Sequence, residues 1–185
     1  MAFGFSYIIF MTFFSKHLVS SCRYAPEAAG RLFMTMGWIS LPCGFLWGSV
    51  SDRIGRKWAL AIVYAIQAAA FALFAWTASP APVLAAVLFG LTAWSIPAIM
   101  AAACGDLLGP RMAPAALGFI TLFFSAGQAA GPSVAGAIAD ARGSLSASLL
   151  LAAGVAILGT AGALGLPPSR SIRVETPRRE ADPDR

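Results

Sequence analysis

The sequence predicts an all-α membrane protein with six transmembrane helices. Mean hydropathy is +0.75 and 11% of the residues are charged, values outside the range of ordinary soluble domains. A helix needs about 20 apolar residues to cross a bilayer, and six such windows carry few or no charges. A buried core helix explains one window, but not six in succession with the charges confined to the gaps. The predicted spans are 2–20, 32–50, 58–77, 82–104, 113–139 and 144–166, followed by a polar tail at 167–185.

The positive charges predict which side of the membrane each connector faces. Lys16, Arg23, Arg31 and Arg142 fall on one side, and the other nine of the 13 Lys and Arg residues fall on the side of the tail. Because cytoplasmic loops are richer in Lys and Arg, both termini are predicted to be cytoplasmic, with a disordered tail. The basic residues form no separate domain or groove, which argues against nucleic-acid binding.

Residues typical of catalysis or metal binding are scarce. The three cysteines have neither metal-ligand spacing nor a disulfide framework, and His17 is the single histidine. The spans contain no paired His/carboxylate cluster and no Ser–His pair. The sequence therefore predicts no enzyme, no metal site and no cofactor.

The first span follows Met1 directly, and residues 1–15 contain no cation. A secretory signal peptide begins with positive charge, so this segment is interpreted as a transmembrane helix. Few residues precede Lys16, which favours a first helix that is shortened at its cytoplasmic end. We therefore expect Met1 to be an internal start or a fragment boundary.

The connector after the second span carries the most distinctive pattern of the chain. Gly48, Asp52 and Gly55 share a spacing that recurs over residues 136–143. The first copy ends a span on the inside and the second ends a span on the outside. This arrangement predicts two three-helix units in opposite orientation, a 3+3 inverted repeat.

Each residue type in this connector suits a loop at the cytoplasmic surface. Gly48 permits close approach of a neighbouring helix, and Gly55 permits a tight turn. Asp52 can face the N-terminus of another helix, whose dipole favours an anion. Three cations can anchor the loop at the lipid surface: Arg53, Arg56 and Lys57.

The connector resembles the signature loop of the major facilitator superfamily of transporters, G-x-L-a-D-r-x-G-r-k-x-x-l. In that family the loop is a latch of the transport gate, made in one access state and broken in the other. A plain positively charged loop is the alternative. The pattern departs mildly at Val50 and Ser51 and matches at Gly48, Asp52, Arg53, Gly55, Arg56, Lys57 and Leu60.

A second pattern, in the fifth span, resembles the superfamily's G-x8-G-x3-G-P-x2-G-G motif, which is linked with export by antiport. Glycines on one helix face permit close packing, and a proline bends the helix. Packing without any role in antiport is the alternative. The motif comprises Gly118, Gly127, Gly131, Pro132 and Gly136, with Ala135 in place of one glycine.

Three segments, 4–14, 47–48 and 127–132, make the chain resemble the C-terminal half of a YbfB/YjiJ-type member. The resemblance extends to Leu166 and implies one half of a two-bundle transporter. The fourth span contains no arginine, whereas N-terminal halves often carry one there. This absence supports the C-terminal assignment.

Polar residues inside the spans are few. No carboxylate, Lys or Arg lies near the middle of any span after the first, so the chain offers no midplane residue for proton relay. Asp106 and Asp140 lie near span ends and are interpreted as helix-end or interface groups. The candidates to line a transport cavity, with hydrogen bonding between helices as the alternative role, are Tyr7, Thr12, Gln67, Ser95 and Gln128.

The predicted function is secondary transport of a small molecule across a bacterial-type inner membrane by alternating access, with proton coupling expected. One bundle has nothing to rock against, so a separate N-terminal half or a second copy is expected as partner. The alternatives are a non-transporting membrane assembly or interaction subunit, and an inactive remnant of a split transporter gene.

Overall fold

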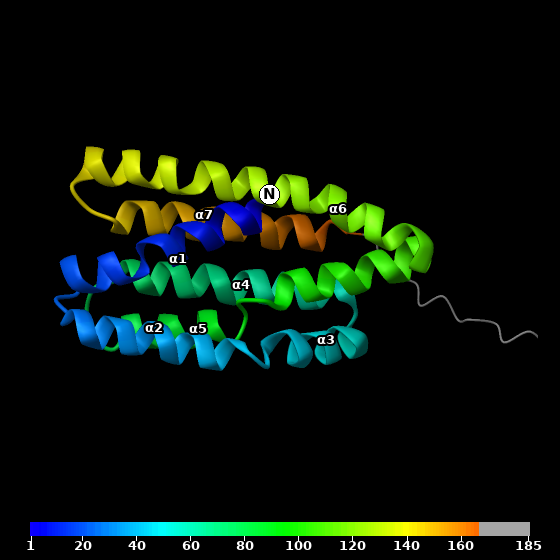
Figure 1. Ribbon diagram of the computed structural model, residues 1–185, viewed down its shortest axis with the longest axis horizontal. Helices are drawn as coiled ribbons and strands as arrows, with labels where there is room; N and C mark the ends of the chain where they lie inside the picture. The colour runs from blue at the N-terminus through cyan, green and yellow to red at the C-terminus, as the bar shows by residue number, and fades with distance from the viewer. Residues whose placement is uncertain (167–185) are drawn as a thin grey trace, which may run out of the picture.

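The computed structural model describes residues 1–166 and contains seven helices (Figure 1). No strand occurs in this range, which confirms the predicted all-α class. The predicted tail, 167–185, lies outside the described residues. The helices are α1 Ala2–Ser20, α2 Pro26–Ser40, α3 Cys43–Ile54, α4 Arg56–Ala75, α5 Ala81–Gly90, α6 Ser95–Arg142 and α7 Ser146–Leu164.

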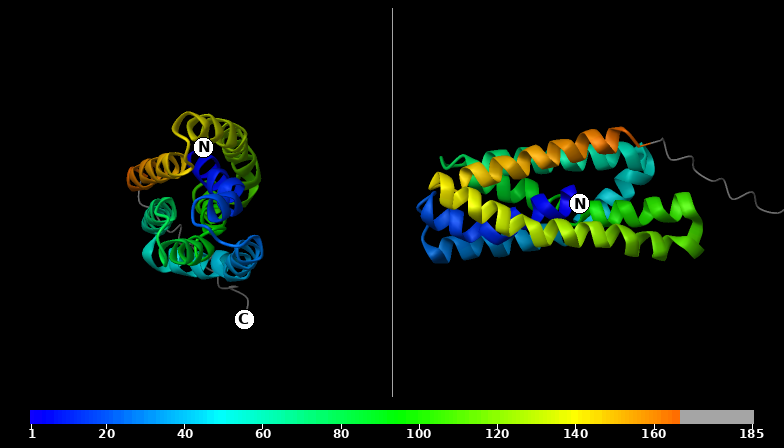
Figure 2. Two further views of the ribbon diagram at one scale, coloured as in Figure 1. Left: turned by 90° about the vertical axis from the view of Figure 1, so that its left-hand side faces the viewer. Right: turned by 90° about the horizontal axis from the view of Figure 1, so that it is seen from above.

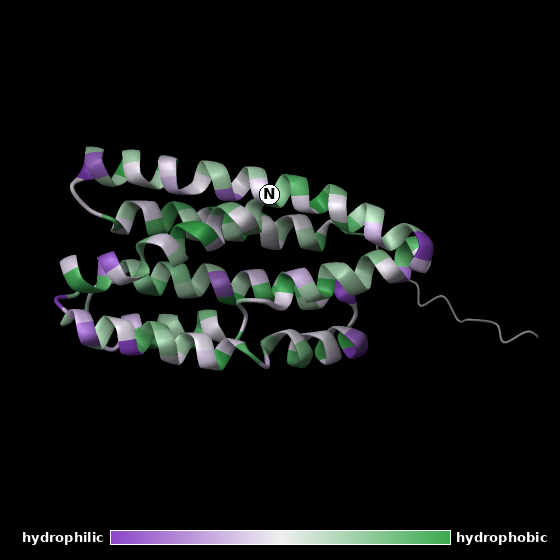
Figure 3. Ribbon diagram, viewed as in Figure 1, coloured by the Kyte–Doolittle hydropathy of each residue, from purple (hydrophilic) through white to green (hydrophobic). Residues whose placement is uncertain are grey.

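Four helical segments are long and apolar enough to cross a membrane. The helices run side by side along the long axis of the molecule (Figures 1 and 2), and most of the strongly polar residues gather towards its two ends (Figure 3). The predicted span 32–50 is divided between α2 and α3, which have 15 and 12 residues and are individually too short to cross. The four segments are Ala2–Ser20, Arg56–Ala75, Ala81–Arg142 and Ser146–Leu164.

Helix α6 is two helices joined at a kink. Gly109 has φ 73° and ψ 168°, and it is the only residue of α6 with non-helical angles. Glycine adopts a positive φ readily because it has no Cβ. The kink falls between the predicted spans 82–104 and 113–139, whereas Pro132 continues the helix without such a break.

The core is built from phenylalanine rings on α1, α4 and α5. Phe10 lies 4.4 Å from Phe89 between ring centroids, and Phe14 lies 4.9 Å from Phe74. Phe10 and Phe14 are four residues apart, so they share one face of α1. All four rings are fully buried, and this cluster fixes α1 against α4 and α5.

Helix α1 also packs against the second part of α6 through glycines. A Cβ at Gly127 would lie 2.5 Å from the Met1 carbonyl oxygen, and one at Gly131 would lie 2.5 Å from Ile8 Cγ2. Backbones can approach this closely only where side chains are absent. At Gly118 and Gly136 a Cβ would meet no atom of another helix within 4 Å. Two of the four glycines of the predicted packing motif therefore make the close contact.

Candidate functional site

The connector between α3 and α4 is a turn of one residue. Helix α3 ends at Ile54 and α4 begins at Arg56, so Gly55 alone reverses the chain, with φ 91° and ψ 148°. This is a backbone conformation that side-chain-bearing residues rarely adopt. The tight turn lies where the sequence predicts one, and it holds Asp52 and Arg56 on the same side of the connector.

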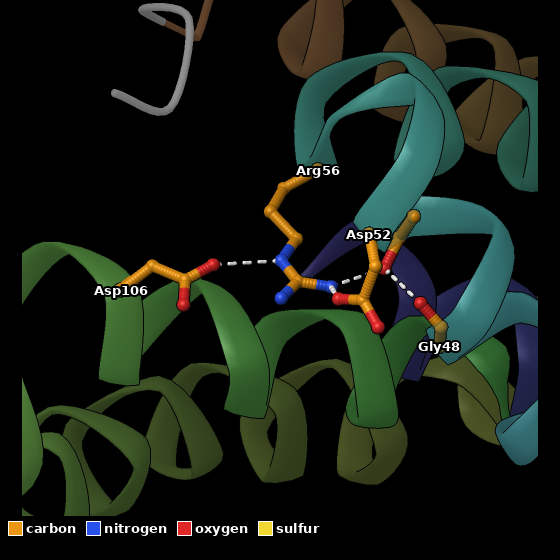
Figure 4. A network of polar contacts seen from close by, with 5 residues as sticks. Gly48, Asp52, Arg56 and Asp106 are labelled. Carbon is orange, nitrogen blue, oxygen red and sulfur yellow. Dashed lines mark hydrogen bonds and ion pairs between the residues drawn. The ribbon is translucent and has the colours of Figure 1, made fainter. Parts of the chain in front are cut away.

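Arg56 is the centre of a polar network around this turn (Figure 4). Its Nε donates a hydrogen bond to Oδ2 of Asp106 at 2.8 Å. Its Nη1 pairs with the carboxylate of Asp52 and donates to the hydroxyl of Ser51. That hydroxyl donates in turn to the Gly48 carbonyl oxygen at 2.7 Å. One guanidinium therefore joins the end of α3 to the first part of α6.

The three charged side chains differ in their access to solvent. Arg56 is 14% exposed, whereas Asp106 is 40% and Asp52 is 61% exposed. A guanidinium offers donors in a fixed fork, which lets it hold two carboxylates at once. Asp52 has the most exposed side chain of the three, so its carboxylate is accessible to a second partner.

Several sequence expectations for this loop differ from the arrangement in the structure. Among residues 1–166 the partner of Asp52 is Arg56 rather than a helix N-terminus. A Cβ at Gly48 would meet no described atom within 4 Å, so no helix approaches it closely here. Lys57 lies with its Nζ 6.0 Å from the ring centroid of Trp58. Asp106 does have an interface role, because it accepts the hydrogen bond from Arg56, but its spacing in the sequence gives no indication of that partner.

Two helix breaks lie side by side near the middle of the long axis (Figure 1). Leu41 and Pro42 separate α2 from α3, and the turn 91–94 separates α5 from α6. The indole N–H of Trp47 donates to the Leu91 carbonyl oxygen at 2.9 Å, and the backbone N–H of Trp94 donates to Cys43 Sγ at 3.3 Å. Helix α3 thus provides partners for backbone groups that the second break leaves free.

The predicted cavity residues occupy different environments. Gln67 is fully buried and its Nε2 donates to the Thr92 carbonyl oxygen at 3.1 Å, which is the interhelical role given as the alternative. Ser95 is also fully buried, at the start of α6. Thr12 is exposed and Gln128 is partly buried. Tyr7 lines a cavity.

That cavity has a volume of about 110 Å³ and lies between α1, α2 and the turn 91–94. Its wall is aromatic and thioether-rich, with one serine. We call it the break cavity, and its lining residues are Tyr7, Met11, Phe33, Met36, Gly37, Ser40, Phe89, Ala93 and Trp94. None of them is charged. Elsewhere in residues 1–166, no three His, Cys, Asp or Glu side chains are grouped so that they could hold a metal ion.

Apolar helices long enough to cross a bilayer, with interrupted helices at mid-length and a charged turn at one end, define a multi-pass helical membrane protein. Residues 1–164 match the family described as "Uncharacterised MFS-type transporter YbfB", and the chain belongs to that family. The match confirms the resemblance to this type of major facilitator superfamily member. No curated protein and no solved structure matched the chain.

Proposed function

We propose that the chain is a transport bundle that moves a small molecule across the inner membrane by alternating access, with proton coupling. The single observation that carries this proposal is the Arg56 network at the turn of the signature loop, in a chain that belongs to a transporter family. In the proposal the bundle crosses the membrane six times, as a 3+3 inverted repeat. The crossings are α1, α2 with α3, α4, 81–109, 110–142 and α7.

The ends of the helices support this topology. The α3–α4 turn and the kink at Gly109 lie at one end of the long axis, with Arg53, Lys57 and Arg111 (Figure 1). The α1–α2 and α6–α7 connectors lie at the other end. Because Lys and Arg concentrate on the cytoplasmic side, the end with the turn faces the cytoplasm in this proposal. We propose the same side for both termini, and α1 runs from the N-terminus near mid-length towards the opposite end (Figure 1).

The network gives the loop a way to hold one access state. Arg56 keeps the turn fastened to α6 through Asp106, while Asp52 is exposed enough to take a second partner. A helix N-terminus of another bundle is such a partner, since its dipole favours a carboxylate. Contact with that helix in one state only would shift the equilibrium between states by the free energy of the contact.

The second bundle is a separate N-terminal half or a second copy of this chain. The outer sides of α2 and α3 carry large exposed apolar residues, including Trp38 at 67% and Phe45 at 80%. Rocking of one bundle against another requires such a partner. Lipid covers these side chains wherever the partner does not.

The test combines reconstitution with the Asp52→Asn substitution. Solutes are first screened for those that raise the melting temperature of the purified chain. These solutes are then tested for counterflow in vesicles that contain the chain alone, the chain at rising copy number, or the chain co-expressed with an N-terminal six-helix half. We expect Asp52→Asn to lower counterflow at least tenfold without changing membrane insertion, while the control Asp140→Asn leaves it unchanged. Counterflow from a demonstrable monomer would refute the need for a partner. Indifference to Asp52→Asn would favour a non-transporting subunit.

A further inference from the structure

The break cavity is a pocket at a place where the backbone itself is irregular. A Cβ at Gly90 would lie 3.0 Å from the Met36 carbonyl oxygen, so α2 and α5 are in close contact beside the two breaks. Interrupted helices at mid-depth are where proteins that cross membranes place ligand sites, because irregular backbone is tolerated only beside protein or a cavity. We infer that this cavity binds the ring of a small, uncharged aromatic compound. The inference rests on the proposed function and names the class of solute.

The aromatic wall is already assembled in the absence of a ligand. The Tyr7 ring lies 6.1 Å from that of Phe89 at an interplanar angle of 22°, and 5.7 Å from that of Trp94 at 56°. Aromatic rings prefer such offset and tilted neighbours, and a bound ring can extend the same pattern. Met11 and Met36 add thioethers, which contact ring edges favourably and adapt to the shape of a ligand.

The lining selects against charge. None of the nine lining residues is ionisable at neutral pH, so a carboxylate or an ammonium group in the cavity would have no counter-ion. The free energy needed to transfer an unpaired ion into such surroundings is far larger than the favourable free energy of the contacts made by one ring. A hydroxyl group on the ligand can be accommodated, because the cavity offers it a hydrogen-bond acceptor. Ser40 uses its hydroxyl hydrogen on the Gly37 carbonyl oxygen at 2.7 Å, which leaves its oxygen free to accept from a ligand.

The volume of the cavity is on the scale of a single ring. An apolar cavity of about 150 Å³ engineered into another protein holds benzene, and the break cavity has about 110 Å³. A phenol ring is close to this scale, and a small relaxation of the wall accommodates it. Phenol is therefore the probe of choice, because it is uncharged, flat and able to donate one hydrogen bond.

The experiment measures phenol binding to the purified full-length chain by calorimetry, with benzoate, benzylamine and cyclohexanol as comparison compounds. We expect phenol to bind at least tenfold more tightly than each of the three. Gly37→Leu adds volume at the cavity wall where a Cβ meets open space, and we expect it to weaken phenol binding at least tenfold. Gly30→Leu is the matched control, since Gly30 is on the same helix with equally open surroundings but does not line the cavity. Ser40→Ala should weaken phenol about fivefold, the loss expected for one hydrogen bond.

Each outcome decides the inference. Equal binding of benzoate, benzylamine or cyclohexanol, equal weakening by Gly37→Leu and Gly30→Leu, or no phenol binding would overturn it. Binding needs no second bundle and no transport, so the two proposals fail separately. Specific phenol binding without counterflow, even when an N-terminal six-helix half is co-expressed, contradicts the proposed function alone. Counterflow of another class of solute without phenol binding contradicts this inference alone.

Discussion

The bond between Arg56 and Asp106 gives the sharpest test of the loop network. The substitution Asp106→Asn keeps the size of the side chain and removes its charge, so the hydrogen bond from Arg56 Nε becomes one to a neutral acceptor. Arg56 retains Asp52 as a counter-ion. The change therefore removes one of two carboxylate partners without leaving the guanidinium unpaired.

The magnitude follows from the exposure of the two partners. A hydrogen bond to a charged group contributes about 1.5–3 kcal/mol when it is shielded, whereas exposed ion pairs contribute about 0–1 kcal/mol. Asp106 is 40% exposed and Arg56 only 14%, which places this pair between the two classes. We expect a coupling free energy of about 1 kcal/mol, equivalent to about fivefold in an equilibrium constant. Salt should reduce it, because the carboxylate is open to screening.

The assay is a double-mutant cycle of Asp106→Asn and Arg56→Gln, measured as unfolding in mixed micelles by tryptophan fluorescence. Additivity within about 0.3 kcal/mol is the behaviour of independent sites. A coupling below that value would refute the reasoning. The same loss of stability from Asp140→Asn, at the other end of α6, would show that removal of any aspartate has this effect.

Three further predictions concern a helix contact, a turn and a connector. Gly127→Ala should lower the free energy of unfolding by about 1–3 kcal/mol, because the new methyl group meets the Met1 carbonyl, whereas Gly118→Ala should change it little or raise it. Gly55→Ala should cost about 1–3 kcal/mol at φ 91°, measured by the same unfolding assay, and a neutral result would show that the turn relaxes. Burial raises the pKa of the Cys22 thiol above its ordinary value, so its thiolate fraction at neutral pH is lowered. A membrane-impermeant maleimide should therefore label Cys22 slowly, from outside the cell only, and faster as pH rises. Labelling from the cytoplasmic side alone would contradict the proposed orientation.

The sequence predicted the helical class and the family because both depend on local patterns. Charge-free windows report how much apolar surface a segment carries, and the signature loop is contiguous in sequence. The break at 91–94 was not predicted. Residues 91–94 are Leu-Thr-Ala-Trp, and none of them is charged. Hydropathy therefore gives no signal there, and the turn is specified by tertiary contacts such as the hydrogen bond from Trp47 to Leu91.

The site was predicted in part, for a related reason. Spacing identified Asp52 and Arg56, but the partner Asp106 is 50 residues from Arg56 and the pairing requires the fold. The glycine pattern likewise identified a row of glycines in α6, but it did not identify which of them contact α1. The motif marks residues of the right type, and only three-dimensional packing distinguishes Gly127 and Gly131 from Gly118 and Gly136.

The hydrogen bonds that cross between the two breaks also bear on how the protein is made. A bare turn at 91–94 in hydrocarbon would expose backbone groups at a cost of several kcal/mol each. Helix α3, whose Trp47 and Cys43 bond to Leu91 and Trp94, is synthesised before that turn. The acceptor and donor are thus already in the membrane when the turn leaves the ribosome. Because synthesis runs from the N-terminus to the C-terminus, α3 can form these hydrogen bonds as soon as the turn 91–94 inserts. If the turn were synthesised before α3, its backbone groups would lack these partners during insertion.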